Sequence, residues 1–251
     1  MANTEPEPGL SVVVPFFNEA EVALEVADEL GRAMAELGLR WEGLLVDDGS
    51  TDGTLGELER ARGRWPQFRL IRLSQNRGQG AALLRGILEA RAPVIAMMDG
   101  DGQNVPADIG RMLPLLDSAG LVVGVRTPRH DSWLRRRMSR LANAVRRRLL
   151  HDGVNDAGCA LKAFRREVVA SFLPVQMLNP FMPAFAVSGG FTVAEIPVRH
   201  RPRRGGRSKY GLRRLLWRPC LDLLALSWIL RRRIAPEAAG RPPGKGGGAP
   251  G

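Results

Sequence analysis

The chain of 251 residues has few cysteines, few aromatic residues and no long apolar run. Its two cysteines, Cys159 and Cys220, favour a pair of reduced structural thiols over a disulfide framework or a cysteine-based metal site. Aromatic residues make up 6% of the chain and are mostly unclustered, which argues against a stacking platform for single-stranded nucleic acid. Because no apolar run reaches the roughly 20 residues that span a bilayer, we expect no transmembrane helix.

Glycine patterns that bind phosphate are also missing. Gly78-Gln79-Gly80 lacks the third glycine of a dinucleotide fingerprint at the right spacing, and no Gly-Lys-Ser/Thr phosphate loop occurs. The histidines stand in no partner pattern, so we interpret all three as structural. Residues 1–9 are polar and carry proline, which indicates a flexible N-terminal arm without a secretory signal.

Positive charge is in large excess. The formal net charge is +11 and the pI is about 11.2, which indicates an anionic partner such as nucleic acid, acidic lipid or a phosphorylated substrate. No helix-turn-helix, zinc or RNA-recognition pattern supports the first of these, so we expect no nucleic-acid partner. Hydrophobic residues make up 44% of the chain, enough for one large domain with a real core.

Short apolar runs alternate with stretches of helical periodicity. The runs predict buried strands at residues 10–14, 44–46, 68–73 and 93–96, and the periodic stretches between them predict helices. This alternation is typical of right-handed crossovers, so we expect an α/β fold with a mostly parallel, Rossmann-like sheet flanked by helices. Polar clusters follow the strands, at the edge where open α/β sheets bind ligands.

The central chemical feature is the sequence 97–103, in which Asp99 and Asp101 follow the fourth predicted strand. Two crowded carboxylates repel each other unless a cation or a donor lies between them. Mg²⁺ or Mn²⁺, held by one or two carboxylates and by substrate phosphates, is the usual solution. Asp101 and Gln103 would supply hard oxygen ligands to it. The alternative is a polar loop with ordinary turn chemistry.

Several motifs occur in the order of one known family. They lie at residues 14–19 (VPFFNE), 46–52 (VDDGSTD), 76–78 (NRG), 99–103 (DGDGQ), 122–126 (VVGVR), 155–159 (NDAGC) and 203–210 (RRGGRSKY). The ordered set resembles the family 2 inverting glycosyltransferases of GT-A fold. It is most similar to their dolichol-phosphate mannosyltransferase-like branch, whose members load a sugar onto a polyprenyl phosphate. The resemblance covers about residues 10–215.

The resemblance implies a role for each matching side chain. The catalytic residues would be Asp101 and Asp156, and Arg126 would meet the acceptor phosphate. The metal would be held by Asp99, Asp101 and Gln103. The nucleotide-sugar donor would be bound by Pro15, Glu19, Asp48, Asp99, Arg204, Ser208 and Lys209, the last three from a mobile loop.

Other readings stay open for two of these residues. Asp48 could cap a helix at a turn instead of bonding the base. Asp156 could form an Asx turn, or could orient the acceptor or the metal instead of acting as a base. A phosphomonoester has a second pKa of about 6, so the acceptor is largely dianionic at neutral pH and needs little help from a base. Relatives often carry larger residues where this chain has Gly100 and Gly102, which leaves the sugar preference open.

Two basic segments have an amphipathic pattern. Residues 132–151 can be drawn as one helix with an apolar stripe, flanked by arginines at 135–137, 140 and 146–148. The segment 212–234 contains the apolar stretch 221–230, which is too short to span a bilayer and ends in three arginines. Such helices lie on anionic membranes, although ordinary core packing is the alternative.

We therefore divide the chain into a glycosyltransferase domain over residues 10–215, which includes an interfacial helix at 132–151, a second interfacial helix at 216–234 and a disordered tail at 235–251. We expect an enzyme, bound peripherally to the cytoplasmic face of a membrane, that moves a sugar from a GDP- or UDP-linked donor to polyprenyl phosphate with Mg²⁺ or Mn²⁺. The alternatives are the same fold acting on a soluble or polysaccharide acceptor, and a non-catalytic nucleotide- or lipid-binding module. The oligomeric state does not follow from the sequence.

Overall fold

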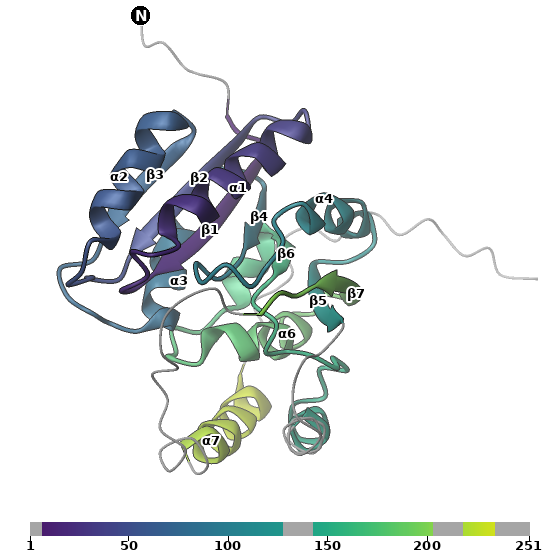
Figure 1. Ribbon diagram of the computed structural model, residues 1–251. Helices are drawn as coiled ribbons and strands as arrows, with labels where there is room; N and C mark the ends of the chain where they lie inside the picture. The colour runs from purple at the N-terminus through teal and green to yellow at the C-terminus, as the bar shows by residue number, and fades with distance from the viewer. Residues whose placement is uncertain (1–6, 128–142, 203–217, 234–251) are drawn as a thin grey trace, which may run out of the picture.

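The computed structural model describes residues 7–127, 143–202 and 218–233 (Figure 1). Seven strands form one sheet in the order β3-β2-β1-β4-β6-β5-β7. Strand β6 is antiparallel to both of its neighbours, and the other six strands run in one direction. The strands are β1 (Leu10–Phe16), β2 (Trp41–Asp47), β3 (Phe68–Arg72), β4 (Val94–Met97), β5 (Leu121–Thr127), β6 (Lys162–Arg165) and β7 (Val193–Arg199). The predicted mostly parallel α/β sheet is confirmed, whereas its antiparallel strand β6 was not predicted.

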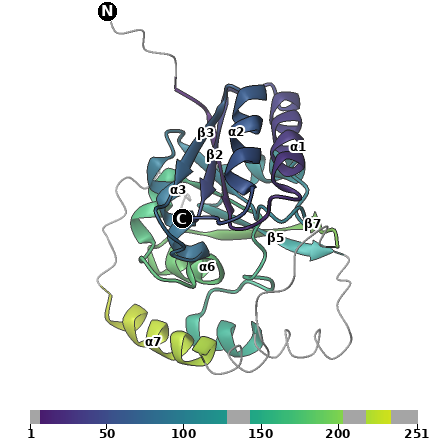
Figure 2. The same ribbon diagram turned by 60° about the vertical axis from the view of Figure 1, so that its left-hand side comes forward.

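Helices cover both faces of this sheet (Figure 2). One face packs against α1 (Ala23–Glu36), α2 (Thr54–Arg64), α4 (Asp108–Met112) and the 3₁₀ helix η1 (Leu113–Asp117). The other face packs against α3 (Gln79–Glu89), α6 (Leu178–Ser188) and the 3₁₀ helix η2 (Arg166–Ser171). Each face of the sheet has its own hydrophobic core, and successive residues of β1 point alternately into the two. Val12 and Val14 lie in the core of the first face, and Val13 lies in that of the second. A sheet buried on both faces explains the continuous apolar runs of the first strands.

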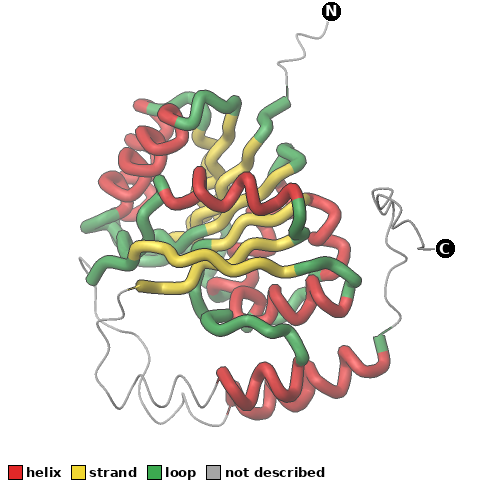
Figure 3. The backbone as a smooth tube through the Cα atoms, turned by 90° about the vertical axis from the view of Figure 1, so that its right-hand side faces the viewer, coloured by secondary structure: helices red, strands yellow, loops and turns green. Residues whose placement is uncertain are grey.

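Two helices form a separate layer below the second face (Figures 1 and 3). One is α7 (Arg218–Arg232), and the other spans residues 143–150. They lie side by side, since the Ser227 hydroxyl donates a hydrogen bond to the Leu149 carbonyl at 3.3 Å. Leu150 and Leu226 attach this layer to the second core. Across the three described ranges, no helix combines the length and the hydropathy that crossing a bilayer would require.

The two predicted interfacial segments overlap these helices only in part. Residues 132–142 lie outside the described part of the chain, as do the first residues of the predicted arm and the predicted tail at 235–251. Within the described helix at 143–150, Arg146 is buried, and its guanidinium donates to the Asp152 carboxylate and to the Val154 carbonyl. The prediction that Arg146 is one of the exposed arginines flanking the apolar stripe was therefore wrong. Its side chain instead holds the loop that follows its own helix.

Candidate functional site

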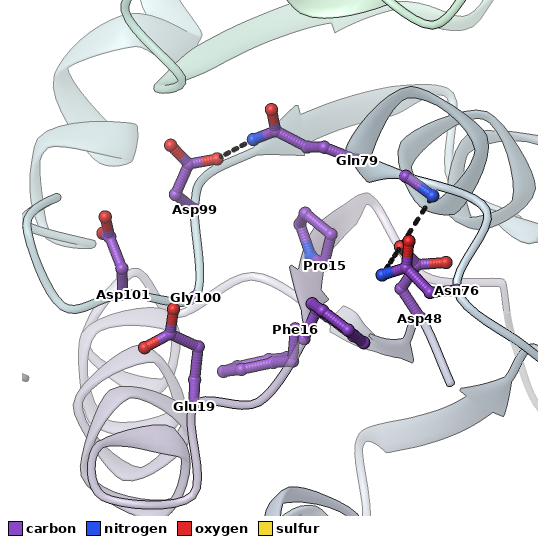
Figure 4. Close-up of a pocket in the computed structure, with 11 residues that line it drawn as sticks. Pro15, Phe16, Glu19, Asp48, Asn76, Gln79, Asp99, Gly100 and Asp101 are labelled. Atoms are coloured by element: carbon purple, nitrogen blue, oxygen red, sulfur yellow. Dashed lines mark hydrogen bonds between the residues drawn. The ribbon is translucent and has the colours of Figure 1, made fainter. Parts of the chain in front are cut away.

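A pocket of about 400 Å³ opens at the carboxyl ends of β1 to β4 (Figure 4). The loops that follow these strands supply its walls. Aromatic rings of Phe16 and Phe17 contribute apolar surface, and Asn76 and Gln79 contribute amides. The predicted residues that line this pocket are Pro15, Glu19, Asp48, Asp99 and Asp101. The sheet thus brings together five side chains from three distant sequence motifs.

Asp48 fixes one wall of the pocket. Its buried carboxylate accepts hydrogen bonds from the backbone N–H groups of Arg77 at 2.8 Å and Gly78 at 2.9 Å, and from the Asn76 amide at 3.1 Å. Gly78 has a φ of 90°, a conformation that favours glycine. The helix-capping interpretation of Asp48 is wrong, because the carboxylate that serves the start of α2 belongs to Asp52. Asp48 instead joins the loop after β2 to the loop after β3.

Asp99 and Asp101 form the acidic side of the pocket (Figure 4). Burial and the neighbouring charge of Asp101 raise the pKa of the Asp99 carboxyl to about 6. The positive charge of Lys162 and a hydrogen bond of 2.5 Å from the Gln79 amide to Asp99 Oδ1 act in the opposite direction and only partly offset this rise. Two carboxylates that repel each other in this way form a site at which a cation is stabilised.

The donor set suits a hard divalent cation. Among the described residues, no three histidine, cysteine or acidic side chains are grouped to hold a metal ion. A cation at Asp99 and Asp101 would therefore complete its coordination with phosphate oxygens and water, which is the usual arrangement for Mg²⁺. Gln103, the third predicted ligand, does not line the pocket. Its amide nitrogen donates to the Arg201 carbonyl at 3.3 Å, and its backbone N–H donates to Asp101 Oδ1 at 3.1 Å.

A second polar cluster lies at the carboxyl end of β5. Arg126 Nε donates to Asp156 Oδ2 at 2.9 Å, and Arg126 Nη2 donates to Asp156 Oδ1 at 2.8 Å. The backbone N–H of Arg126 also donates to Asp156 Oδ2, at 3.2 Å. The two residues predicted for the acceptor are therefore close together, as a two-pronged ion pair in which Asp156 is buried.

The loop that carries Asp156 is anchored by residues that the sequence motifs did not identify. Glu195, on β7, accepts hydrogen bonds from the backbone and the side chain of Asn155, both at 2.7 Å. Lys162, on β6, is fully buried, and its ammonium donates to the carbonyls of Ala157 and Cys159 and to the side chain of Asn179. One signal was available: a lone lysine inside the apolar run 159–164 predicts a buried charge with several partners.

Burial lowers the pKa of the Lys162 ammonium to about 8, although the charges of Cys159, Asp99 and Asp156 act in the opposite direction. Cys159 itself is a buried free thiol whose pKa is raised by burial. The Lys162 side chain thus places a positive charge in the protein interior behind both polar clusters. The predicted donor residues Arg204, Ser208 and Lys209 lie outside the described residues.

Comparison with known proteins identifies related chains. A model of the family "Glycosyl transferase family 2" matches residues 11–173. An undecaprenyl-phosphate 4-deoxy-4-formamido-L-arabinose transferase from Edwardsiella ictaluri is 36% identical over 210 residues, which cover 82% of this chain and 64% of that protein. A dodecaprenyl-phosphate galacturonate synthase from Rhizobium johnstonii is 38% identical over 233 residues, which cover 90% of this chain and 69% of that protein. The chain thus spans about two thirds of the length of these relatives.

Solved structures share the fold. A mannosyltransferase from Pyrobaculum calidifontis, in complex with GDP-Man and Mn²⁺, aligns with a TM-score of 0.66 at 21% identity, over 93% of this chain and 67% of that one. A glucosyl-3-phosphoglycerate synthase from Mycobacterium tuberculosis, with Mn²⁺, UDP and phosphoglyceric acid, aligns with a TM-score of 0.66 at 20% identity, over 92% and 80% of the two chains. At these identities the likeness confirms the expected GT-A fold.

The burial of Asp99 and its repulsion by Asp101 predict a stabilising substitution. In metal-free buffer at pH 8, we expect Asp99→Asn to raise the free energy of unfolding by about 1 kcal/mol, a value reduced for the solvent that reaches this half-buried carboxylate. The pKa of Asp99 is higher in the folded chain, so the cost of ionising it is absent near pH 4 and develops as the pH rises through about 6. Urea unfolding in a chelator at pH 4 and pH 8 measures the difference, which should vanish at the lower pH.

The control for this experiment is Asp117→Asn, at an exposed aspartate that does not line the pocket. It should leave the free energy of unfolding unchanged at both pH values. An Asp99→Asn protein no more stable than the parent at pH 8 would show that ionising Asp99 costs the folded protein no appreciable stability.

Proposed function

The chain belongs to glycosyl transferase family 2, and we propose that it transfers a sugar from a nucleotide-linked donor to a polyprenyl phosphate. Both relatives described above are named for polyprenyl-phosphate acceptors. The observation that carries the proposal is the placement of an acidic pocket and an arginine–aspartate pair at the same edge of one sheet. The pocket would bind the donor, and Arg126 would bind the acceptor phosphate.

In the donor half, each wall of the pocket has a distinct task. Pro15 and Phe16 offer apolar surface to the nucleoside, and Glu19 and Asp48 offer carboxylates to its polar groups. Mg²⁺ or Mn²⁺ held by Asp99 and Asp101 would neutralise the charge that develops on the leaving diphosphate. We keep Gln103, Arg204, Ser208 and Lys209 as proposed contacts to the metal and the diphosphate, as the family resemblance implies.

In the acceptor half, Arg126 is the principal phosphate contact. The two-pronged pair with Asp156 holds its guanidinium in place, and arginine is the side chain best suited to binding a phosphate. The acceptor phosphate is largely dianionic at neutral pH and is already a competent nucleophile. We therefore propose that Asp156 contributes to catalysis by orienting Arg126 rather than by removing a proton.

Asp101→Ala tests the donor half. We expect it to lower kcat for sugar transfer by about 100-fold or more, because the leaving diphosphate would lose the charge compensation that the metal provides. The assay combines a short polyprenyl phosphate with a panel of GDP- and UDP-sugars, with and without a chelator. Asp117→Ala, an exposed site outside the pocket, is the matched control and should retain full activity.

Two outcomes would count against this proposal. Absence of product with every donor in the panel would reject transfer to polyprenyl phosphate. Near-normal turnover by the Asp101→Ala protein in the chelator would reject the metal site while leaving transfer itself in place.

A surface of α7 supports attachment to a membrane. Leu221, Leu224 and Trp228 are 52%, 56% and 59% exposed and follow one another at spacings of three and four, so they share one face of the helix. The Arg232 guanidinium lies 4.5 Å from the centre of the Trp228 ring at the end of this face. Apolar side chains bordered by arginines are suited to the headgroup region of an anionic bilayer. We propose that this face holds the enzyme at the membrane that contains its acceptor.

Substitution of this face should weaken membrane attachment. We expect Leu224→Ser with Trp228→Ser to reduce binding to anionic vesicles at least about tenfold, because burial of each large apolar side chain contributes about 1.5 to 3 kcal/mol. Binding of the parent should also fall at high salt. Sedimentation with vesicles measures both effects. Leu88→Ser, at an apolar residue of α3 that is 64% exposed, is the control, and equal sedimentation of the double variant and the parent would contradict the proposal.

A further inference from the structure

Glu195 lies behind the acceptor pair rather than within it. It belongs to β7, which runs parallel to β5 and places Glu195 opposite Val123, three residues before Arg126. Its Oε1 accepts hydrogen bonds from the backbone N–H groups of Asn155 at 2.7 Å and Asp156 at 3.3 Å. Its Oε2 accepts a third from the Asn155 amide at 2.7 Å. One carboxylate thus binds two successive peptide groups and the side chain between them.

These contacts determine where the Asp156 side chain leaves the loop. Two consecutive N–H groups that point at one carboxylate fix the orientation of the peptide planes on either side of the Asn155 α-carbon. The Asp156 carboxylate then meets Arg126 through three hydrogen bonds, two of them to the guanidinium. A rotation of this backbone would move the carboxylate out of the plane that a two-pronged contact requires.

Neighbouring anchors hold other parts of the same loop. Lys162 binds the carbonyls of residues 157 and 159, and Arg146 binds the carbonyl of Val154. Both act on carbonyl oxygens on either side of the Asn155–Asp156 peptide, whereas Glu195 acts on the N–H groups of that peptide unit and the one before it. Glu195 is half-buried on an edge strand and belongs to neither hydrophobic core, so the core packing does not depend on it.

We propose that Glu195 is a positioning residue for the acceptor phosphate: it fixes the Asn155–Asp156 backbone so that Asp156 holds Arg126 in its binding orientation. The inference rests on the proposed function, in which Arg126 binds that phosphate. Glu195 contacts neither substrate and acts through Asp156. Glutamine is the appropriate probe because it keeps the size of the side chain but replaces one of the two acceptor oxygens with a donor.

The first experiment does not depend on catalysis. In ¹⁵N-labelled protein, the Nε–H resonance of Arg126, identified by its loss in Arg126→Lys, reports the contact with Asp156. Glu195→Gln should increase the solvent exchange rate of this proton about tenfold. The matched control is Glu89→Gln, because the Glu89 carboxylate pairs with Arg69 and Arg85 at the far end of α3. An exchange rate in Glu195→Gln equal to that in the control would overturn the inference.

The second experiment measures transfer to a short polyprenyl phosphate. Glu195→Gln should lower kcat/KM for the acceptor about tenfold and leave KM for the donor within twofold of the parent. Adding Glu195→Gln to Asp156→Asn should cause no further loss, since a residue that acts only through Asp156 has no effect once that carboxylate is gone. Additive losses, or equal losses for donor and acceptor together with a lower Tm, would show a merely structural role and overturn the inference.

The two experiments separate the inference from the function on which it rests. A parent protein that transfers no sugar to any polyprenyl phosphate would reject the proposed function, and the exchange rate of the Arg126 proton would still decide whether Glu195 positions that side chain. A parent that transfers sugar, with a Glu195→Gln protein that matches Glu89→Gln in both measurements, would reject the inference alone.

Discussion

The parallel sheet gathers carboxylates at one edge, and the candidate site depends on how the negative charge of each one is compensated. Two of them, Asp48 and Asp99, follow strands that end at this edge, and Asp156 lies in the loop before β6. Each carboxylate is stabilised differently. Asp48 accepts three neutral N–H donors, and Asp156 faces a guanidinium. Burial and the charge of Asp101 raise the pKa of Asp99 to about 6, and the Gln79 amide and the charge of Lys162 offset this rise only in part. The compensation is least complete at Asp99, and this is the physical basis for proposing a cation there.

Several positive charges of the chain are likewise taken up by contacts within the fold. Arg165 and Arg166 donate to backbone carbonyls of residues 116, 90 and 92, and Arg199 holds the buried Asp108 at the start of α4. These arginines tie helices and loops to the sheet. The net charge of +11 therefore overstates what is available to an anionic partner. The arginines near the exposed face of α7 are better evidence for a lipid surface than the composition of the whole chain.

Local patterns in the sequence predicted the features that depend on local interactions. The first four strands come from apolar runs, and Asp99 and Asp101 come from the loop that ends the fourth. Pro15, Glu19 and Asp48 were predicted through the family resemblance. The pairings within the site could not be predicted in this way, because their partners are far apart in the sequence. Asp48 is hydrogen-bonded to residues 76–78, and Glu195 to Asn155, 40 residues away. Strand β6 also went unpredicted, since it is only four residues long and has a charged residue at each end, Lys162 and Arg165.

That short strand determines the spacing of the site. It lies between β4, which leads to Asp99, and β5, which ends beside Arg126. Two strand spacings separate β4 from β5, which is about 10 Å. Inversion at a sugar carbon requires the leaving diphosphate and the attacking phosphate on opposite sides of the ring, so the proposed reaction needs a gap of this order between its two halves. Lys162 pairs in register with both Met97 and Val123, and its buried ammonium donates a hydrogen bond to the loop that carries Asp156. The inserted strand thus separates the proposed donor and acceptor halves and anchors the loop of the second.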